Sequence, residues 1–135
     1  ATNTIWCLSY YNSQRKFDRV YLASFLKEHG ADLIHVTTAI KYGHLRLAKW
    51  LIQSKCKIYD TYLTDVKSRD GITLLLQNGV KNINHNDTVY GTALFYHSQR
   101  GNIDAVRALL DHNADKSVLC TKEKLTAIEI ARKNK

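Results

Sequence analysis

Histidine and cysteine are the side chains of this sequence best suited to catalysis or metal binding, and neither type is arranged for it. The six histidines lack the Cys-x-x-Cys or His-x-x-x-His spacing that brings two ligands to one metal ion. They are His29, His35, His44, His85, His97 and His112. The three cysteines are also far apart: Cys7, Cys56 and Cys120. We therefore expect no metal site, and reduced, buried cysteines in an intracellular protein rather than a disulfide framework.

The motifs of the common catalytic and cofactor-binding sites are absent from the sequence. It contains no G-x-G-x-x-G or G-x-x-x-x-G-K-[ST] phosphate loop, no H-E-x-x-H zinc motif and no G-x-S-x-G nucleophile turn. We therefore expect no catalytic residue, no cofactor and no enzymatic activity.

Basic side chains are the remaining candidates for a binding function, because the formal net charge is +8. Such a charge favours acidic partners, nucleic acid among them. Residues 41–57 hold five basic residues and no acidic one. However, Arg46, Lys49 and Gln53 lie opposite the apolar residues of their segment, which is the ordinary pattern of a solvated helix face. Residues 116–135 hold six basic and two acidic residues, which fits an electrostatic arm or a fraying end.

Length and composition are typical of one globular domain. The 135 residues, 44% of them hydrophobic, suffice for a core. No apolar run is long enough to span a membrane. A single domain over residues 1–135 is the expected organisation.

The elements that must position these residues recur as pairs of short helices. In the clearest pair, Thr92 caps a first helix that Gly101 ends, and a second helix runs from about Asn102 to His112. Asn113 then takes the left-handed closing position. The apolar residues of the second helix fall at i, i+1, i+4 and i+5 and form one stripe: Ala105, Val106, Leu109 and Leu110.

This segment resembles the ankyrin repeat, whose pattern D-x-x-G-x-T-P-L-H-x-A-A-x-x-G-H is followed by an apolar helix and the triplet G-A-D. The matching residues are Asp87, Thr92, Leu94, Gly101 and Asn113-Ala114-Asp115. The departures are Tyr90 for the finger glycine, Ala93 for proline, Phe95 for histidine and His97-Ser98 for Ala-Ala. His97 replaces a small residue where repeats pack closely, so it is either a partly buried, hydrogen-bonded histidine or a side chain that faces a ligand.

The resemblance extends over the chain and implies an all-α, ankyrin-type helix-turn-helix solenoid of about four to five irregular repeats. The expected units are an atypical N-terminal repeat or cap at 1–32, repeats at 33–57, 58–81 and 82–115, and a partial repeat at 116–135. The partial repeat is either a C-terminal cap or a unit that was cut. A HEAT-like or TPR-like array is the alternative fold, but TPR units lack the glycine turn and the G-A-D closure.

Individual helices follow from the same comparison. The second unit should have its second helix at Leu45–Gln53, after the turn Gly43-His44. The third unit should have its first helix at Tyr59–Val66, and its second helix should carry the stripe residues Ile72, Leu75 and Leu76.

The spacing of the units predicts where hairpin fingers occur. The closing-triplet positions Ala31, Cys56, Val80 and Ala114 follow one another at intervals of 25, 24 and 34 residues. An ordinary ankyrin unit has about 33 residues, so only the last interval has room for a finger. We therefore expect fingers only in the second half, at about 82–91 and 116–125. Short, irregular units of this kind resemble those of viral and intracellular-bacterial proteins.

The function that the resemblance implies is that of a non-catalytic protein–protein interaction scaffold. Its partner would lie in the concave groove and against the finger tips. A more specific expectation is a host-directed effector or inhibitor that is intracellular, in the cytoplasm or nucleus, a host cell included. The expected partner is another protein with an acidic surface, with no membrane involved. The alternative is an electrostatic binder of nucleic acid or another polyanion through the basic surface.

The family's partner contacts can be carried over to matching positions. They are Lys41 and Tyr42 in the second unit, Thr88, Val89, Tyr90, Gly91, Gln99 and Arg100 in the fourth, and Lys122, Glu123, Leu125, Lys133 and Asn134 in the fifth. Among them Tyr42, Tyr90 and Arg100 are the best candidates for binding hot spots. Because Gly91 is displaced by one residue from the family's finger glycine, we expect an altered tip around Tyr90.

Overall fold

The structure is a computed structural model that describes residues 36–54 and 56–134. The atypical repeat expected at 1–32 lies outside the described residues. Within the described part the regular elements are helices, and β-pairing is limited to one isolated bridge. The helices are α3 (Val36–Lys41), α4 (Leu45–Gln53), α5 (Tyr62–Asp65), α6 (Arg69–Asn78), α7 (Ala93–Arg100), α8 (Ile103–Asp111) and α9 (Ala127–Lys133). No helix in this part is long and apolar enough to cross a membrane.

The chain divides into two compact units, residues 1–57 and 58–135. The division falls at the predicted boundary between the second and third repeats. The single-domain organisation of the whole chain stays a prediction. The two units are described separately below.

The described part of the first unit is a pair of packed helices. α3 and α4 are joined by a tight turn in which Gly43 adopts a left-handed conformation, with φ at 77°. The predicted bounds of α4 are confirmed. Leu47, Ala48 and Leu51 are buried, while Ile52 at the edge of the stripe is half-buried. The pair is therefore held together by the apolar stripe that the sequence predicts.

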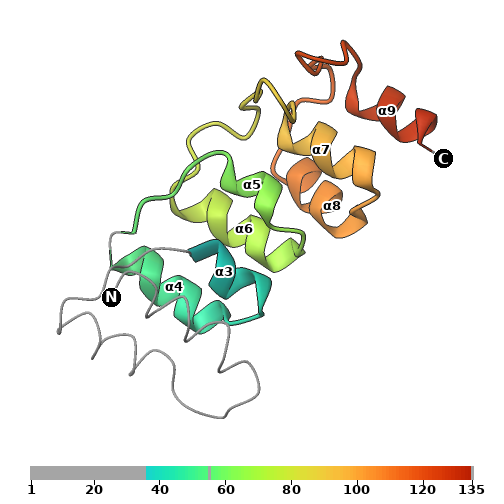
Figure 1. The fold of residues 1–135 in the computed structure, drawn as a ribbon. Helices are drawn as coiled ribbons and strands as arrows, with labels where there is room; N and C mark the ends of the chain where they lie inside the picture. Colours follow the sequence, from blue (N-terminus) through green and yellow to red (C-terminus); the bar gives the residue numbers. More distant parts are fainter. Residues whose placement is uncertain (1–35, 55, 135) are drawn as a thin grey trace. The chain divides into compact units, whose positions relative to one another are not determined.

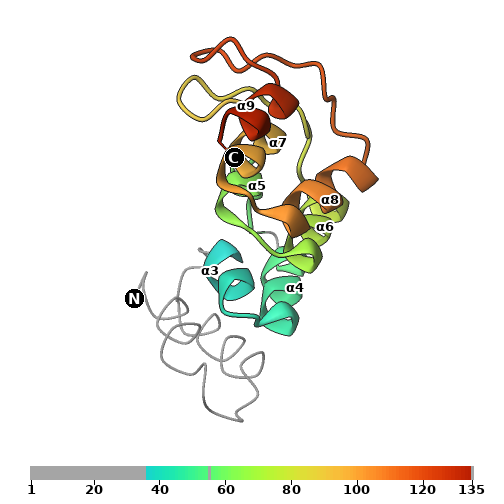
Figure 2. The same ribbon diagram turned by 90° about the vertical axis from the view of Figure 1, so that its right-hand side faces the viewer.

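The second unit consists of two layers of helices (Figures 1 and 2). The inner layer contains α5, α7 and α9, and the outer layer contains α6 and α8. α7 packs against α9 and α8, and α6 packs against α8. This arrangement is the stacking of helix pairs expected for a solenoid.

Three helices of the second unit begin at a capping side chain. The Ser68 hydroxyl accepts a hydrogen bond from Gly71 N, the Thr92 hydroxyl accepts one from Phe95 N, and Thr126 forms a capping box with Glu129. Each cap satisfies an amide that the helix itself leaves unpaired, which is typically worth about 1 kcal/mol. The predicted cap at Thr92 is confirmed.

The first helix of the third repeat is shorter than predicted. The sequence predicts Tyr59–Val66, but α5 covers only Tyr62–Asp65. The reason is local: Val66 adopts an extended conformation, with φ −111° and ψ 126°. Its side chain is buried, and the chain leaves the helix at that residue.

The outer helix α8 confirms the apolar stripe with one correction. In α8, Ala105 and Leu109 are buried and Val106 is half-buried, but Leu110 is 38% exposed. Ala108, which the predicted stripe omits, is buried instead. The i+5 position therefore lies at the edge of the stripe, as Ile52 does in α4.

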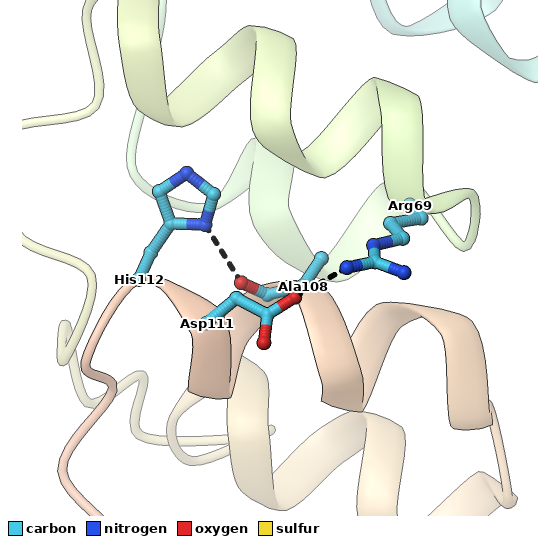
Figure 3. Close-up of polar contacts among 4 residues, drawn as sticks. All are labelled: Arg69, Ala108, Asp111 and His112. Atoms are coloured by element: carbon cyan, nitrogen blue, oxygen red, sulfur yellow. Dashed lines mark hydrogen bonds and ion pairs between the residues drawn. The ribbon is translucent and has the colours of Figure 1, made fainter.

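An ion pair joins the two outer helices of the second unit (Figure 3). Arg69 Nη2 of α6 lies 2.7 Å from Asp111 Oδ2 of α8. On α8 itself, the Ala108 carbonyl accepts a hydrogen bond of 2.8 Å from His112 Nδ1. Both charged side chains are more than half exposed, so the ion pair contributes little to stability, although it shows which flank of α8 faces α6.

The two predicted fingers are present as loops that end in backbone pairs. In the first, Asp87 and Gly91 exchange hydrogen bonds of 3.0 and 2.9 Å. In the second, Cys120 N donates to the Leu125 carbonyl and Lys124 N donates to the Cys120 carbonyl. The loops at 82–91 and 116–125 lie beside each other (Figures 1 and 2). A hydrogen bond connects them, in which Asn86 Nδ2 donates to the Leu119 carbonyl over 2.8 Å.

Candidate functional site

The tip of the first finger presents two large apolar side chains to solvent. Val89 is 59% exposed and Tyr90 is 51% exposed. The tip is fixed by Asp87, whose Oδ1 accepts hydrogen bonds from Val89 N at 2.7 Å and Tyr90 N at 3.0 Å. These bonds hold the pKa of the Asp87 carboxyl below its ordinary value of 3.8. The exposed pair therefore stands on a rigid turn.

Gly91 is a structural part of this finger. Its φ is 73°, in the left-handed region. A Cβ at this position would lie 3.0 Å from Cys120 Sγ. Only glycine fits both the conformation and the space. Gly91 is predicted to contact the partner, but it is buried. A partner at this tip would instead meet the exposed neighbours Val89 and Tyr90.

Tyr90 continues into a row of rings on α7. The Tyr90 and Tyr96 ring centroids are 5.5 Å apart, edge to face, and the Arg100 guanidinium lies over the Tyr96 ring, 4.7 Å from its centroid. Both contacts are attractive through the ring quadrupole. The structure thus brings together the predicted hot-spot residues Tyr90 and Arg100, which are separated by ten residues. We call Val89, Tyr90, Tyr96 and Arg100 the tyrosine–arginine surface.

Tyr96 is missing from the sequence-based set, although a signal for it exists. It lies one helical turn before Arg100, a spacing that places two side chains on the same helix face. The contact between Tyr96 and Tyr90 depends on how the finger folds back over α7, and the repeat pattern carries no information on that.

The remaining predicted site residues have varied positions. Thr88, Gln99, Lys122, Glu123, Lys133 and Asn134 are exposed, and the Asn134 side chain donates to the Gln99 carbonyl over 3.2 Å. Leu125 instead packs against the buried cluster of Phe95, Cys120 and Ile130. Lys41 and Tyr42 belong to the first unit, where the Lys41 ammonium lies 5.7 Å from the centre of the Tyr42 ring.

A hollow of about 210 Å³ lies beside the first finger. It is bounded by the start of α5 and by the finger, with Tyr90 on its wall. The residues that line it are Asp60, Thr61, Thr64, Asp65, Ile83, His85, Asp87, Tyr90, Gly91 and Ala93. Three of them are carboxylates, and sequence reasoning had assigned none of these three to a site.

His97 lies in the core and not on the binding surface. Its side chain is fully buried. The Leu63 carbonyl accepts a hydrogen bond of 2.7 Å from His97 Nε2, and His97 Nδ1 accepts one of 3.0 Å from Asn102 Nδ2. The interpretation of His97 as a hydrogen-bonded core histidine is therefore confirmed.

The basic residues are unevenly distributed between the two units. Residues 1–57 contain nine basic and three acidic residues, and residues 58–135 contain eleven and nine. The net charges are therefore +6 and +2. Because the tyrosine–arginine surface and the hollow both lie in the second unit, the overall charge of +8 says little about them.

Residues suited to a metal site do not cluster in the described ranges 36–54 and 56–134. No three His, Cys, Asp or Glu side chains there come close enough together to hold one ion. Cys120 is a buried, free thiol.

Comparison with models of known families identifies the family to which the helix pairs belong. A family model for ankyrin repeats, in three copies, matches residues 38–135, which is nearly three quarters of the chain. The chain belongs to the ankyrin-repeat family, and the predicted resemblance is confirmed. A comparison with curated proteins finds no match. Ankyrin repeats are protein–protein interaction modules and are generally non-catalytic.

Proposed function

We propose that this protein is a non-catalytic scaffold that binds a partner protein through the tyrosine–arginine surface of its second unit. The observation that carries the proposal is the exposed Tyr90 at the tip of a rigid finger, in ring contact with Tyr96, over which Arg100 lies. Tyrosine and arginine supply a large share of the energy at protein interfaces.

Preorganisation supports the same surface. An interface that must first order its side chains loses about 0.5–1.5 kcal/mol for each mobile one. Here the hydrogen bonds of Asp87 fix the finger, and the ring contacts of Tyr96 restrain both Tyr90 and Arg100. Binding of a partner to these side chains therefore loses little free energy to side-chain ordering.

The test is a quantitative affinity capture with the full chain as bait. Lysate proteins are compared between the wild type, Tyr90→Ala and Arg100→Ala. We expect at least one protein whose retention falls about thirtyfold with either variant, since truncation of such an anchor costs about 2 kcal/mol or more. Thermal melting of each variant shows that it is folded.

The matched control is the double variant Arg46→Glu plus Lys49→Glu on the exposed outer face of α4. It should retain the same protein to nearly the wild-type level, because rim and remote charges mainly alter the association rate. The proposal is wrong if the double variant abolishes the capture while Tyr90→Ala and Arg100→Ala leave it unchanged.

A second candidate function is electrostatic binding of a polyanion such as nucleic acid. The observation in its favour is the net charge of +6 over residues 1–57, with Arg46 and Lys49 exposed on α4. This function would use a different part of the chain and would weaken steeply with salt. We rank it second because the tyrosine–arginine surface, which groups residues typical of a protein interface, lies in the second unit.

An intracellular location is also part of the proposal. The free thiol of Cys120 supports it, since unpaired thiols are typical of reducing compartments.

A further inference from the structure

The hollow beside Tyr90 differs in character from the tyrosine–arginine surface. Its volume of about 210 Å³ is several times the ~30 Å³ that one water molecule occupies in the liquid, so a side chain can enter. Its polar lining includes the carboxylates of Asp60, Asp65 and Asp87 together with the imidazole of His85. Tyr90 is shared between the two sites and forms their common edge.

No Lys or Arg side chain in the described ranges forms an ion pair with the three carboxylates, although His85, which also lines the hollow, interacts electrostatically with Asp87. Asp60 Oδ1 accepts from the backbone amides of Lys81 and Asn82, at 2.8 and 3.3 Å, and Asp87 Oδ1 accepts from the amides of the finger tip. The ion pair found among the described residues lies elsewhere, between Arg69 and Asp111. The negative charge of the hollow is therefore available to a ligand.

We propose that this hollow receives a cationic side chain, for which arginine has the best shape, from the protein that docks on Tyr90. The inference rests on the proposed function, because it names the chemistry that the partner must bring to the same finger. The partner surface that meets this finger is then basic, and not acidic as the overall charge of +8 would suggest.

The arrangement of the lining favours a guanidinium group over a compact ion. The carboxylates are spread around the hollow and do not form a group that could hold a metal ion within the described ranges. A guanidinium is planar, carries five donors and also stacks on aromatic rings. It can therefore bond to separate carboxylates while it lies against the Tyr90 ring.

The state of Asp65 supports the same conclusion. Partial burial raises the pKa of its carboxyl above the ordinary value of 3.8. A carboxylate that is partly desolvated and has no cation beside it gains stabilisation when one arrives. Binding of a cation should therefore lower the pKa of Asp65.

The experiment is an NMR titration of the full chain with N-acetyl-arginine-N-methylamide. The matched probe is the citrulline analogue, which has nearly the same shape and no charge. We expect saturable shifts of the backbone amides at 60–65 and 83–91 with the arginine probe, and at least threefold weaker binding of the citrulline probe. Equal binding of the two probes, or no shift up to about 20 mM arginine probe, overturns the proposal.

Substitutions of single aspartates test whether the arginine probe binds in the hollow. Asp65→Asn and Asp87→Asn remove charge and keep an acceptor oxygen, so the finger tip stays hydrogen-bonded. Each should lower the affinity for the arginine probe about three- to fivefold, as expected for partly exposed ion pairs. Asp104→Asn, on the exposed face of α8 and away from the hollow, is the control and should have no effect. Equal effects of all three variants would show non-specific attraction and overturn the proposal.

The titration is independent of the capture experiment. If Tyr90→Ala leaves every captured protein in place while the arginine probe still binds at the hollow, the proposed function fails and the cation site stands. The opposite result is that Tyr90→Ala removes a captured partner, while Asp65→Asn and Asp87→Asn leave the binding of that partner unchanged. The proposed function then stands and the inference about the partner fails.

Discussion

His97 connects two successive repeats of the second unit. Its Nε2–H donates to the Leu63 carbonyl of α5, and its Nδ1 accepts from Asn102 at the turn before α8. The bond from Asn102 requires the neutral imidazole, because a protonated ring has no acceptor nitrogen, whereas the bond to Leu63 needs only the Nε2–H donor. Burial lowers the pKa of His97 below 6.5, and the nearby positive charges of Lys67 and Arg100 lower it further, whereas the bond to Leu63 acts in the opposite direction.

This histidine predicts a pH-dependent stability. A lowered folded-state pKa means that the unfolded chain binds the proton more tightly, so the stabilisation is fully present above pH 6.5 and is lost as the pH falls below it. We expect the urea midpoint of the wild type to fall between pH 7.5 and pH 5. The midpoint of His97→Gln should fall less over the same range.

The lower limit of pH 5 lies above the ordinary pKa values of three carboxylates that also stabilise the folded state. The pKa values of Asp87, Asp115 and Glu129 are lowered from ordinary values of 3.8, 3.8 and 4.5, so their contributions are lost only at lower pH. An equal fall of the midpoint in wild type and variant would show that His97 does not cause the pH dependence.

The left-handed residues explain why the finger tips could be predicted only approximately. In the first finger Gly91 takes this conformation one residue before the cap Thr92, whereas in the second Lys124 takes it, with φ at 56°, two residues before the cap Thr126. A position carried over from the family pattern is therefore displaced by one residue in one finger. The sequence does predict the displacement at Gly91, but the contacts of Tyr90 follow only from the folded tip.

At the scale of the helices, the apolar stripe of α8 has fully buried residues at its centre and a partly exposed residue at its edge. In α8, Leu109 has no exposed surface and the next residue, Leu110, is 38% exposed. Two adjacent leucines therefore provide an internal comparison of centre and edge on one helix.

Leu109→Ala should lower the free energy of unfolding by about 2–5 kcal/mol, because it removes a buried side chain from a packed core. Leu110→Ala should cost less than about 1 kcal/mol, because much of that side chain is already in water. Urea denaturation of both variants tests the pair. Equal losses would show that the phase of α8 is wrong.

The helices that the sequence predicted best are those that carry both a stripe and a stop signal. α4 has its predicted bounds, and α8 lies within one residue of them at each end. α5 has neither signal, since Lys67 stands where the repeat has its glycine. Its length depends on how Val66 reaches the core, which is a matter of packing and not of pattern.

At the scale of the molecule, the uneven charge predicts where a polyanion would bind. Residues 1–57 carry a net charge of +6 and residues 58–135 carry +2. We expect Arg46→Glu plus Lys49→Glu to elute from a heparin column at clearly lower salt than the wild type, because each lost cation removes counterion release.

The control has the same change in total charge. Arg107→Glu plus Lys116→Glu alters two exposed residues of the second unit. Its elution should shift less than that of the α4 pair. Equal shifts would mean that heparin responds only to total charge, and the second candidate function would lose its support.

The hollow beside Tyr90 has a consequence for how such a protein changes over evolutionary time. It lies next to a repeat without a finger, and Asp60 and Thr61 of the short segment that opens this repeat line its wall. That repeat is shorter than an ordinary unit by about nine residues, roughly one finger. A single insertion or deletion could therefore fill or create such a site while every helix-packing residue is kept. Among irregular arrays, partner choice can then diverge through changes in length rather than through gradual substitution.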